Sequence, residues 1–263
     1  MYGFIIKKNF CDGWDNLFSM IVANVCMLFA GAGLVLLNAY LSINILVQLL
    51  LYIFSFSVMS ILMFAYGEVA AKIANFNGVH VVDFFKAITG AIKDGIFFGI
   101  LNAVITWVST IAISYYFFQT KSMIGLFFGA MICWIDIFVI LAFQWFIPIR
   151  SLMHNNFKKC LKKCFLIFFD NKGFTILTAL YNLVLIVFSV VLLGFAPSFA
   201  GLIIANTNAL RIRLYKYDYL EEHPELETRA EQKQIPWEEL IYDDREALGP
   251  RKFKSFIFPW KDD

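Results

Sequence analysis

Charged residues are scarce in this sequence. Only 16% of its 263 residues are Asp, Glu, Lys or Arg, whereas 60% are hydrophobic and 30 are phenylalanine. A water-soluble fold of this length cannot bury so much apolar surface, so the composition excludes a soluble globular protein and favours a polytopic membrane protein. The scarcity is confined to the first part of the chain, because residues 211–263 carry 10 basic and 13 acidic residues.

Cysteines are too few and too unevenly placed for a disulfide framework. There are five, an odd number, and all fall in apolar runs or in segments expected on the cytoplasmic face. Cys160 and Cys164 are four residues apart and His154 lies nearby, but no further ligand of suitable spacing accompanies them. We interpret the pair as two small apolar residues on a buried stripe.

Catalytic motifs are missing as well. The sequence contains no Gly-rich phosphate loop after a strand, no nucleophile motif and no HExxH pair. We therefore expect no enzymatic activity and no cofactor. The first residues, MYGFIIKKNFCDGWDN, lack a long apolar core followed by a small-residue cleavage site, so no removable signal peptide is expected.

Long apolar runs are what the sequence has instead. They predict an all-α polytopic membrane protein whose membrane domain, residues 1–216, has six transmembrane helices at about residues 17–37, 46–66, 96–118, 123–147, 174–195 and 196–214. The last span is the weakest, because residues 196–210 form an apolar run of only 15 residues that includes Asn206, Thr207 and Asn208. If this run is re-entrant and folds back, the number of spans is five.

The basic segment after Pro148 sets the expected orientation. By the positive-inside rule, a segment this rich in lysine lies in the cytoplasm. With six spans, 21 of the 22 Lys and Arg residues lie on that side, Lys121 excepted, and so do both termini. Aromatic residues at the span ends are then expected at the headgroup levels, with Tyr66 and Trp145 on the inner side.

Two amphipathic segments are expected to lie as helices in the cytoplasmic-side interface. In residues 78–95, apolar residues recur at three- and four-residue steps from Val81 to Ile92. In the basic segment, Cys160 and Cys164 belong to an apolar stripe from which four lysines face away: Lys158, Lys159, Lys162 and Lys163. These lysines are candidates for contact with anionic lipid, at about 1 kcal/mol each, although ordinary topological charge is the simpler explanation.

Asp136 is the sharpest functional candidate. A carboxylate in the middle of a span is costly unless it is paired, protonated or exposed to water, and no Lys or Arg lies at matching depth in another span. Neutral residues that could form a polar seam with it include Asn102, Thr106 and Asn182. Two interpretations stay open: a proton- or substrate-binding acid in a cavity, or an aspartic acid that locks helices together at about 1 kcal/mol per hydrogen bond.

The tail, residues 217–263, is expected to be cytoplasmic and helical. Pro236 and Gly249 are suited to the start and the end of a helix. The chain then ends in PRKFKSFIFPWKDD, an aromatic and basic segment that would be sticky in water. We expect it to dock on the cytoplasmic face of the bundle, on lipid headgroups or on a partner, through Phe253, Phe256, Phe258 and Trp260.

Three segments together carry a resemblance to a known family. A first span near the N-terminus, FFKAITGAIKDGIFFGIL before the third span and LKKCFLIFFDNKGFTILTAL before the fifth resemble the YesL-like membrane proteins of bacteria, over roughly residues 14–216. The first span lacks the family's proline at its outer end, MLFAGAGLVLLNAY, and the chain continues beyond the family's usual end. The family has no defined biochemical function and no established catalytic residues. The resemblance implies a bacterial inner-membrane protein that serves ABC-type carbohydrate uptake as an accessory component.

Three functions therefore remain open. The first is the accessory component, with the lipid bilayer, permease or ATPase subunits, or a second copy of the chain as partners. The second is a small-solute or proton-coupled transporter or channel that uses Asp136. The third is a membrane-structural or signalling protein that binds anionic lipid. No nucleic-acid partner is expected, because membrane topology already explains the basic segment.

Overall fold

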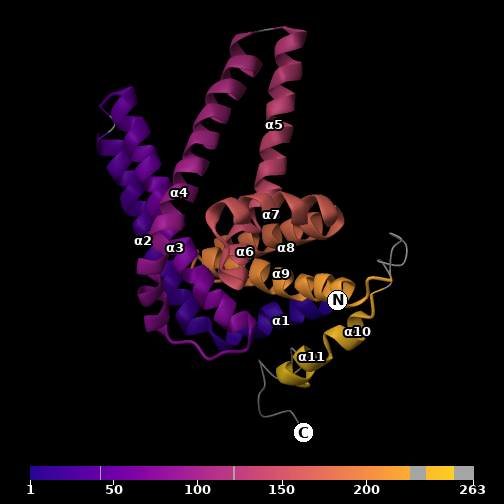
Figure 1. Cartoon of the computed structure of the whole chain (residues 1–263). Helices are drawn as coiled ribbons and strands as arrows, with labels where there is room; N and C mark the ends of the chain where they lie inside the picture. Colours follow the sequence, from indigo (N-terminus) through magenta and orange to yellow (C-terminus); the bar gives the residue numbers. More distant parts are fainter. Residues whose placement is uncertain (42, 121, 226–234, 252–263) are drawn as a thin grey trace.

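The computed structural model describes residues 1–41, 43–120, 122–225 and 235–251. Every element in these residues is helical, so the predicted all-α class is confirmed. Two helical hairpins diverge upward from a base of helices that lie crosswise, and the N-terminal helix α1 and the last described helix, α11, both lie at this base (Figure 1).

Five helices in the described residues are long and apolar enough to cross a membrane, as a polytopic α-helical membrane protein requires. They are α2 (Leu17–Leu41), α3 (Ile45–Ala74), α4 (Val81–Ser114) with the π-helical turn η1 (Tyr115–Gln119), α5 (Met123–Phe143) with α6 (Phe146–Met153), and α8 (Lys172–Val191). Five of the six expected spans fall on these helices.

The sixth expected span, residues 196–214, is not among these five helices. It lies in α9 (Ser198–Glu222), in which Arg211 and Arg213 follow the apolar run and most of the first 15 residues are buried. Because these arginines follow the apolar run so closely, α9 lacks the long apolar stretch of the other five helices. The expected domain boundary after residue 216 falls inside α9.

The two helices α8 and α9 form an antiparallel pair along their whole length. Asn171 at the start of α8 donates to the hydroxyl of Tyr217, Asn182 donates to Asn206, and the backbone of Ser198 donates to Ser189. The residue numbers rise on one helix as they fall on the other, so α9 returns the chain to the end at which α8 begins.

The amphipathic segment expected at residues 78–95 is not a separate interfacial helix. It forms the first half of α4, which starts at Val81 behind a cap in which Asp83 accepts from the backbone N–H of His80, at 2.9 Å. This half packs against α3 and buries Phe84 and Ala91. Phe85 and Ile92 of the same segment stay exposed, so only part of the expected apolar face packs against α3.

Close contact between α3 and α4 depends on two glycines one helical turn apart. A Cβ atom added at Gly99 would lie 2.4 Å from the Cα of Ser57, and one at Gly95 would lie 2.7 Å from the Cα of Ile61. The sequence GIFFG is the small-xxx-small pattern that lets transmembrane helices approach closely. The sequence carries this signal, but hydropathy does not detect it.

The second expected amphipathic helix is present as α7 (Phe157–Asp170), with Cys160 and Cys164 buried on its inner face. The base also contains α1 (Tyr2–Asp15), α10 (Trp237–Leu240) and α11 (Tyr242–Leu248). Tyr66 and Trp145, expected at the headgroups, are instead fully buried, and the indole N–H of Trp145 donates to Thr175 at 3.1 Å. Packing between the hairpins and the base has enclosed them.

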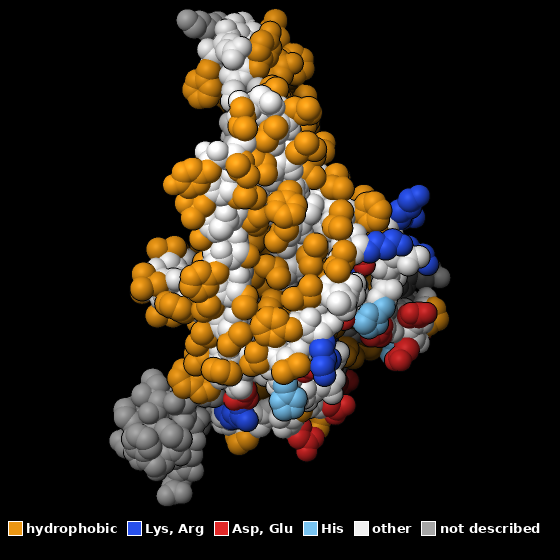
Figure 2. All heavy atoms as spheres, turned by 90° about the vertical axis from the view of Figure 1, so that its left-hand side faces the viewer, with side chains coloured by type: hydrophobic (Ala, Val, Ile, Leu, Met, Phe, Trp, Pro, Cys, Tyr) orange, Lys and Arg blue, Asp and Glu red, His pale blue; other side chains and the backbone are white. Residues whose placement is uncertain are grey.

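Apolar side chains cover the outside of the hairpins, while charged side chains gather in the lower half and at the right-hand edge of the view in Figure 2. On α5 alone, Phe127, Trp134 and Ile140 are each more than half exposed. Large exposed apolar surfaces of this kind are expected for helices that face lipid or other transmembrane helices.

Candidate functional site

A polar cleft opens between α4 and α5, about halfway along their hairpin. The Ser109 hydroxyl of α4 donates to Oδ1 of Asp136 on α5, with an O···O distance of 2.7 Å. The cleft has a volume of about 520 Å³, and its polar lining residues are Asn102, Thr106, Ser109, Thr110, Ser114 and Asp136. The structure thus brings three of the four predicted site residues, Asp136, Asn102 and Thr106, to one place.

The cleft is polar because α4 repeats polar residues at three- and four-residue steps from Asn102 to Ser114, which places them on one face. Most of these side chains donate their hydrogen bonds to backbone carbonyls of α4 itself. The Asn102 amide donates to the carbonyl of Phe98 at 2.8 Å, and the Thr106 hydroxyl donates to the carbonyl of Asn102 at 2.8 Å. The neutral Ser109 hydroxyl reaches across to Asp136.

Asp136 lies near the middle of the apolar region. It is 15 residues after Lys121 and 14 residues before Arg150, which are the nearest basic residues on either side in the sequence. At 1.5 Å per helical residue, each separation corresponds to about 20 Å. Asp136 is therefore an intramembrane acid with no cation of α4 or α5 at its depth.

Asn182 does not belong to this cleft. Its side-chain amide donates to Oδ1 of Asn206 on α9 at 2.7 Å and to Oε1 of Gln144 at 3.4 Å. The expected polar seam is thus divided into the α4–α5 cleft and a separate contact between α8, α9 and the end of α5. Hydropathy along the chain could not reveal this division, because it does not show which helices face each other.

The four lysines expected to contact anionic lipid lie on α7. Lys158, Lys159 and Lys162 are exposed, whereas Lys163 is half-buried and its Nζ lies 3.3 Å from the sulfur of Met153. Behind them, burial raises the pKa of the Cys160 thiol to about 11. Contact of the lysines with lipid stays a prediction. The four aromatic residues expected to dock the tail, Phe253, Phe256, Phe258 and Trp260, lie outside the described residues.

Sequence analysis missed a buried ion pair in the base. Lys8 and Asp12 of α1 are joined at 3.0 Å, and their side chains are 0% and 8% exposed. Asn208 of α9 donates to Asp12 at 2.7 Å, and the Lys8 ammonium lies 3.6 Å from the ring centroid of Phe76. The i,i+4 spacing of Lys8 and Asp12 was the available signal. These contacts hold α1 against α9 and the turn after α3.

Arg150 of α6, the first basic residue after Pro148, joins three helices. Its guanidinium pairs with Glu68 of α3, and it donates to Asp94 at 3.0 Å and to the carbonyl of Gly90 at 2.9 Å. A hollow of about 490 Å³ beside it is lined by two acids, Glu68 and Asp83, and by the bases Lys72, Lys86 and Arg150. Because Arg150 pairs with Glu68 and Lys72 pairs with Asp83, we interpret these groups as a structural network.

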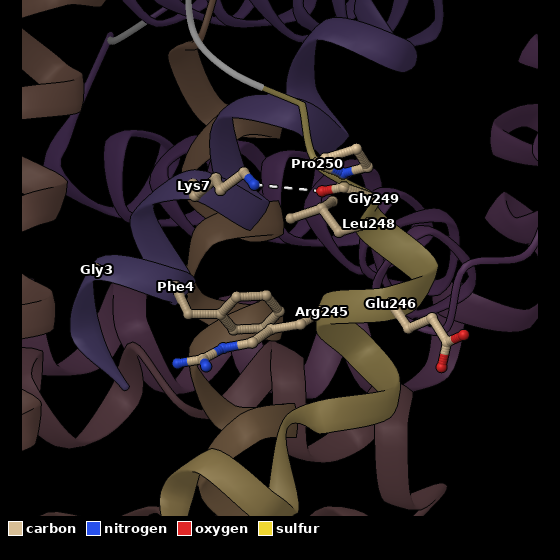
Figure 3. Close-up of a pocket in the computed structure, with 8 residues that line it drawn as sticks. All are labelled: Gly3, Phe4, Lys7, Arg245, Glu246, Leu248, Gly249 and Pro250. Atoms are coloured by element: carbon tan, nitrogen blue, oxygen red, sulfur yellow. Dashed lines mark hydrogen bonds between the residues drawn. The ribbon is translucent and has the colours of Figure 1, made fainter.

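A third hollow, also of about 490 Å³, lies between α1 and α11 (Figure 3). Lys7 donates to the carbonyl of Gly249 at 3.3 Å, and Phe4 and Arg245 lie side by side across the opening. Nearby, Arg211 pairs with both oxygens of Asp244, at 2.5 and 3.0 Å. This hollow is the seam along which α11 docks on the base.

Comparison with family models, with curated proteins and with solved structures finds no match for this chain. The resemblance to the YesL-like proteins therefore stays a prediction. Over the residues that it describes, the structure defines a class, an all-α protein with five helices long and apolar enough to cross a membrane, and any function has to be argued from the cleft and the surfaces around it.

Proposed function

We propose that the protein is a non-enzymatic membrane component that assembles with the subunits of a transport system. The observation that carries this proposal is the place of Asp136. In the described residues, only α4 and α5 line its cleft, so the acid faces the side of a two-helix hairpin instead of the centre of a bundle. A site open on its side is suited to contact with another membrane protein.

The shape of the molecule supports the same proposal. The α4–α5 hairpin stands apart from the α2–α3 hairpin over its upper half (Figure 1). Both hairpins carry large exposed apolar side chains, for example Val104 and Val108 on α4 and Phe54 on α3. A protein that transports a solute alone would be expected to surround its pathway with helices, whereas these helices leave their flanks open to neighbours.

The transport system that we propose is of the ABC type for carbohydrate uptake, in the bacterial inner membrane and with both termini in the cytoplasm. The support is the resemblance to the YesL-like proteins and the distribution of basic residues. The lower end that would face the cytoplasm carries the α7 lysines and the docked helix α11.

The test is gentle detergent extraction of the tagged protein from its native membrane, followed by quantitative mass spectrometry. The proposal predicts permease or ATPase subunits at near-stoichiometric amounts. Recovery of the chain alone, or only with itself, would overturn it. A tagged membrane protein of similar size and abundance from the same cells serves as the control for non-specific recovery.

A second function is favoured by one specific observation. The Asp136 carboxyl group at mid-depth, hydrogen-bonded to Ser109, is an arrangement that proton-coupled transporters use. Reconstituted liposomes with an internal pH-sensitive dye would test it. Proton flux that is abolished in Asp136→Asn would favour a transporter, and absence of flux in the wild-type protein would exclude proton transport by this chain alone.

A further inference from the structure

Within the described residues, the carboxyl group of Asp136 has a hydrogen-bond donor but no charged partner. The hydrogen bond that it receives comes from the neutral hydroxyl of Ser109. Acids at this depth in other membrane proteins almost always face a protein interior or an aqueous cavity and pair with another polar group. Here the cleft is built of two helices only, so the matching group has to come from outside the hairpin.

The cleft has the form of an interface for one more helix. Its centre is polar, and apolar residues border it on both sides, namely Ile105 and Ile113 of α4 and Val139 and Ile140 of α5. Ile140 is 68% exposed. An apolar helix could pack on this border and direct one long polar side chain toward Asp136, as transmembrane helices do when small or polar residues meet at a seam.

Charge identifies the kind of helix. The apolar runs at residues 17–41, 45–71, 95–120, 122–149 and 173–191 contain no Lys or Arg. A second copy of this chain therefore has no cation to offer at the depth of Asp136, and the charged headgroups of lipids lie too far from the bilayer centre to provide one. We propose that the α4–α5 cleft docks a transmembrane helix of another protein that carries a lysine or arginine near the middle of the bilayer. This inference rests on the proposed function and names the partner's chemistry.

The test uses the full chain in liposomes and two designed transmembrane peptides. Both are Leu/Ala helices of equal length, one with a single lysine at its centre and the other with norleucine there. Association is measured by energy transfer between a donor on the protein and an acceptor on the peptide. We expect the lysine peptide to bind about tenfold more tightly than the norleucine peptide.

Substitutions of Asp136 test whether the preference for the lysine peptide arises in the cleft. Asp136→Asn, which keeps the shape of the side chain, should abolish the preference, and Asp136→Glu, which keeps the carboxyl group, should retain it. Ser55→Ala is the matched control. It removes a hydroxyl that accepts a hydrogen bond from the Asn38 amide, and it does so in a different lateral hollow, which lies between α2 and α3. It should leave the preference unchanged.

Three results would overturn the inference: equal binding of both peptides to the wild-type protein, a lysine preference that survives in Asp136→Asn, or association of labelled copies of this chain that depends on Asp136. Failure of the proposed function is distinguishable. If no transport subunits co-purify but the lysine preference holds, only the proposed function fails. If subunits co-purify equally with the wild-type protein and with Asp136→Asn, only the docking site fails.

Discussion

Lys8 and Asp12 hold α1 in the base from inside the protein. Burial lowers the pKa of Lys8 and raises the pKa of Asp12, because each charged form is disfavoured away from water. The pair remains matched because the two charges lie 3.0 Å apart and Asn208 adds a hydrogen bond. Such a pair adds little net stability, but removal of one partner leaves a buried charge without its counterion.

We therefore expect Lys8→Met to destabilise the protein by about 3 kcal/mol. The double variant with Lys8→Met and Asp12→Leu should recover at least half of this loss, because it removes both charges. Equilibrium unfolding in mixed detergent, followed by circular dichroism, measures both. A single variant as stable as the wild-type protein would show that the pair does not hold α1.

Among the elements, α3 and α4 make the tightest contact because Gly99 and Gly95 let their backbones approach. Gly99→Val would place atoms onto the backbone of Ser57, so the helices would have to separate. We expect a loss of at least about 2 kcal/mol in the free energy of unfolding.

Gly90→Ala is the matched control for Gly99→Val. It lies on the same helix, and a Cβ there meets no atom within 4 Å. Because alanine favours helix over glycine, this variant should be neutral or up to about 1 kcal/mol more stable. The same unfolding measurement checks it, and equal effects of the two variants would contradict the close approach of α3 and α4.

Asp170, the last residue of α7, forms a hydrogen bond and an ion pair with residues of α9. The Tyr217 hydroxyl donates to this carboxylate at 2.8 Å, and the Lys216 ammonium lies 3.2 Å from it. Burial alone would raise the pKa of Asp170, but these two groups and Asn171 outweigh it and hold the pKa below its usual value. A lowered pKa in the folded state means that the contact stabilises above about pH 4 and is lost as the pH falls through the folded pKa.

Asp170→Asn should therefore lower the stability by about 1 kcal/mol at pH 7, and the difference from the wild-type protein should shrink as the pH falls below about 4. Thermal unfolding at several pH values checks this. Asp218→Asn is the control on α9, because burial and the neighbouring Glu221 and Glu222 raise the pKa of Asp218. It should not lower the stability at pH 7. A difference for Asp170→Asn that stays constant as the pH falls below about 4 would contradict the assignment.

In the whole molecule, the first and the last described segments meet at the base. Lys7 contacts Gly249, and Arg251 lies 2.5 Å from Asp15. Because α9 returns along α8, the chain comes back to the side from which α8 starts. The structure therefore places α1 and α11 on one side of any membrane that the hairpins enter, with the α4–α5 connection on the other.

Single cysteines in a cysteine-free background test this arrangement. With an impermeant maleimide on intact cells, we expect labelling of Ser122→Cys and no labelling of Gly3→Cys or Tyr242→Cys until the membrane is opened, if the base faces the cytoplasm as we propose. Labelling of Tyr242→Cys but not Gly3→Cys in intact cells would place the two ends on opposite sides and contradict the α8–α9 return.

Much of the fold could be predicted, since hydropathy and charge report how each segment interacts with lipid and water. The helix at residues 17–41 and the α4–α5 hairpin follow from apolar length alone. The same reasoning identified Asp136 as a candidate, because one acid in an apolar run is conspicuous. It did not show that residues 78–95 run on into the third span as one helix, or that residues 196–214 pack against protein, because composition does not record which helices meet.

The sequence by itself thus determined the helical membrane class, five of the spans and the depth of Asp136, because these depend on residue type and position along a helix. Only the tertiary structure decided that Ser109, Asn102 and Thr106 share the cleft with Asp136 while Asn182 pairs with α9. It also decided that Lys8 and Asp12 are buried. The physical reason is that partners across helices depend on rotation and packing, which are set by contacts between residues far apart in the chain.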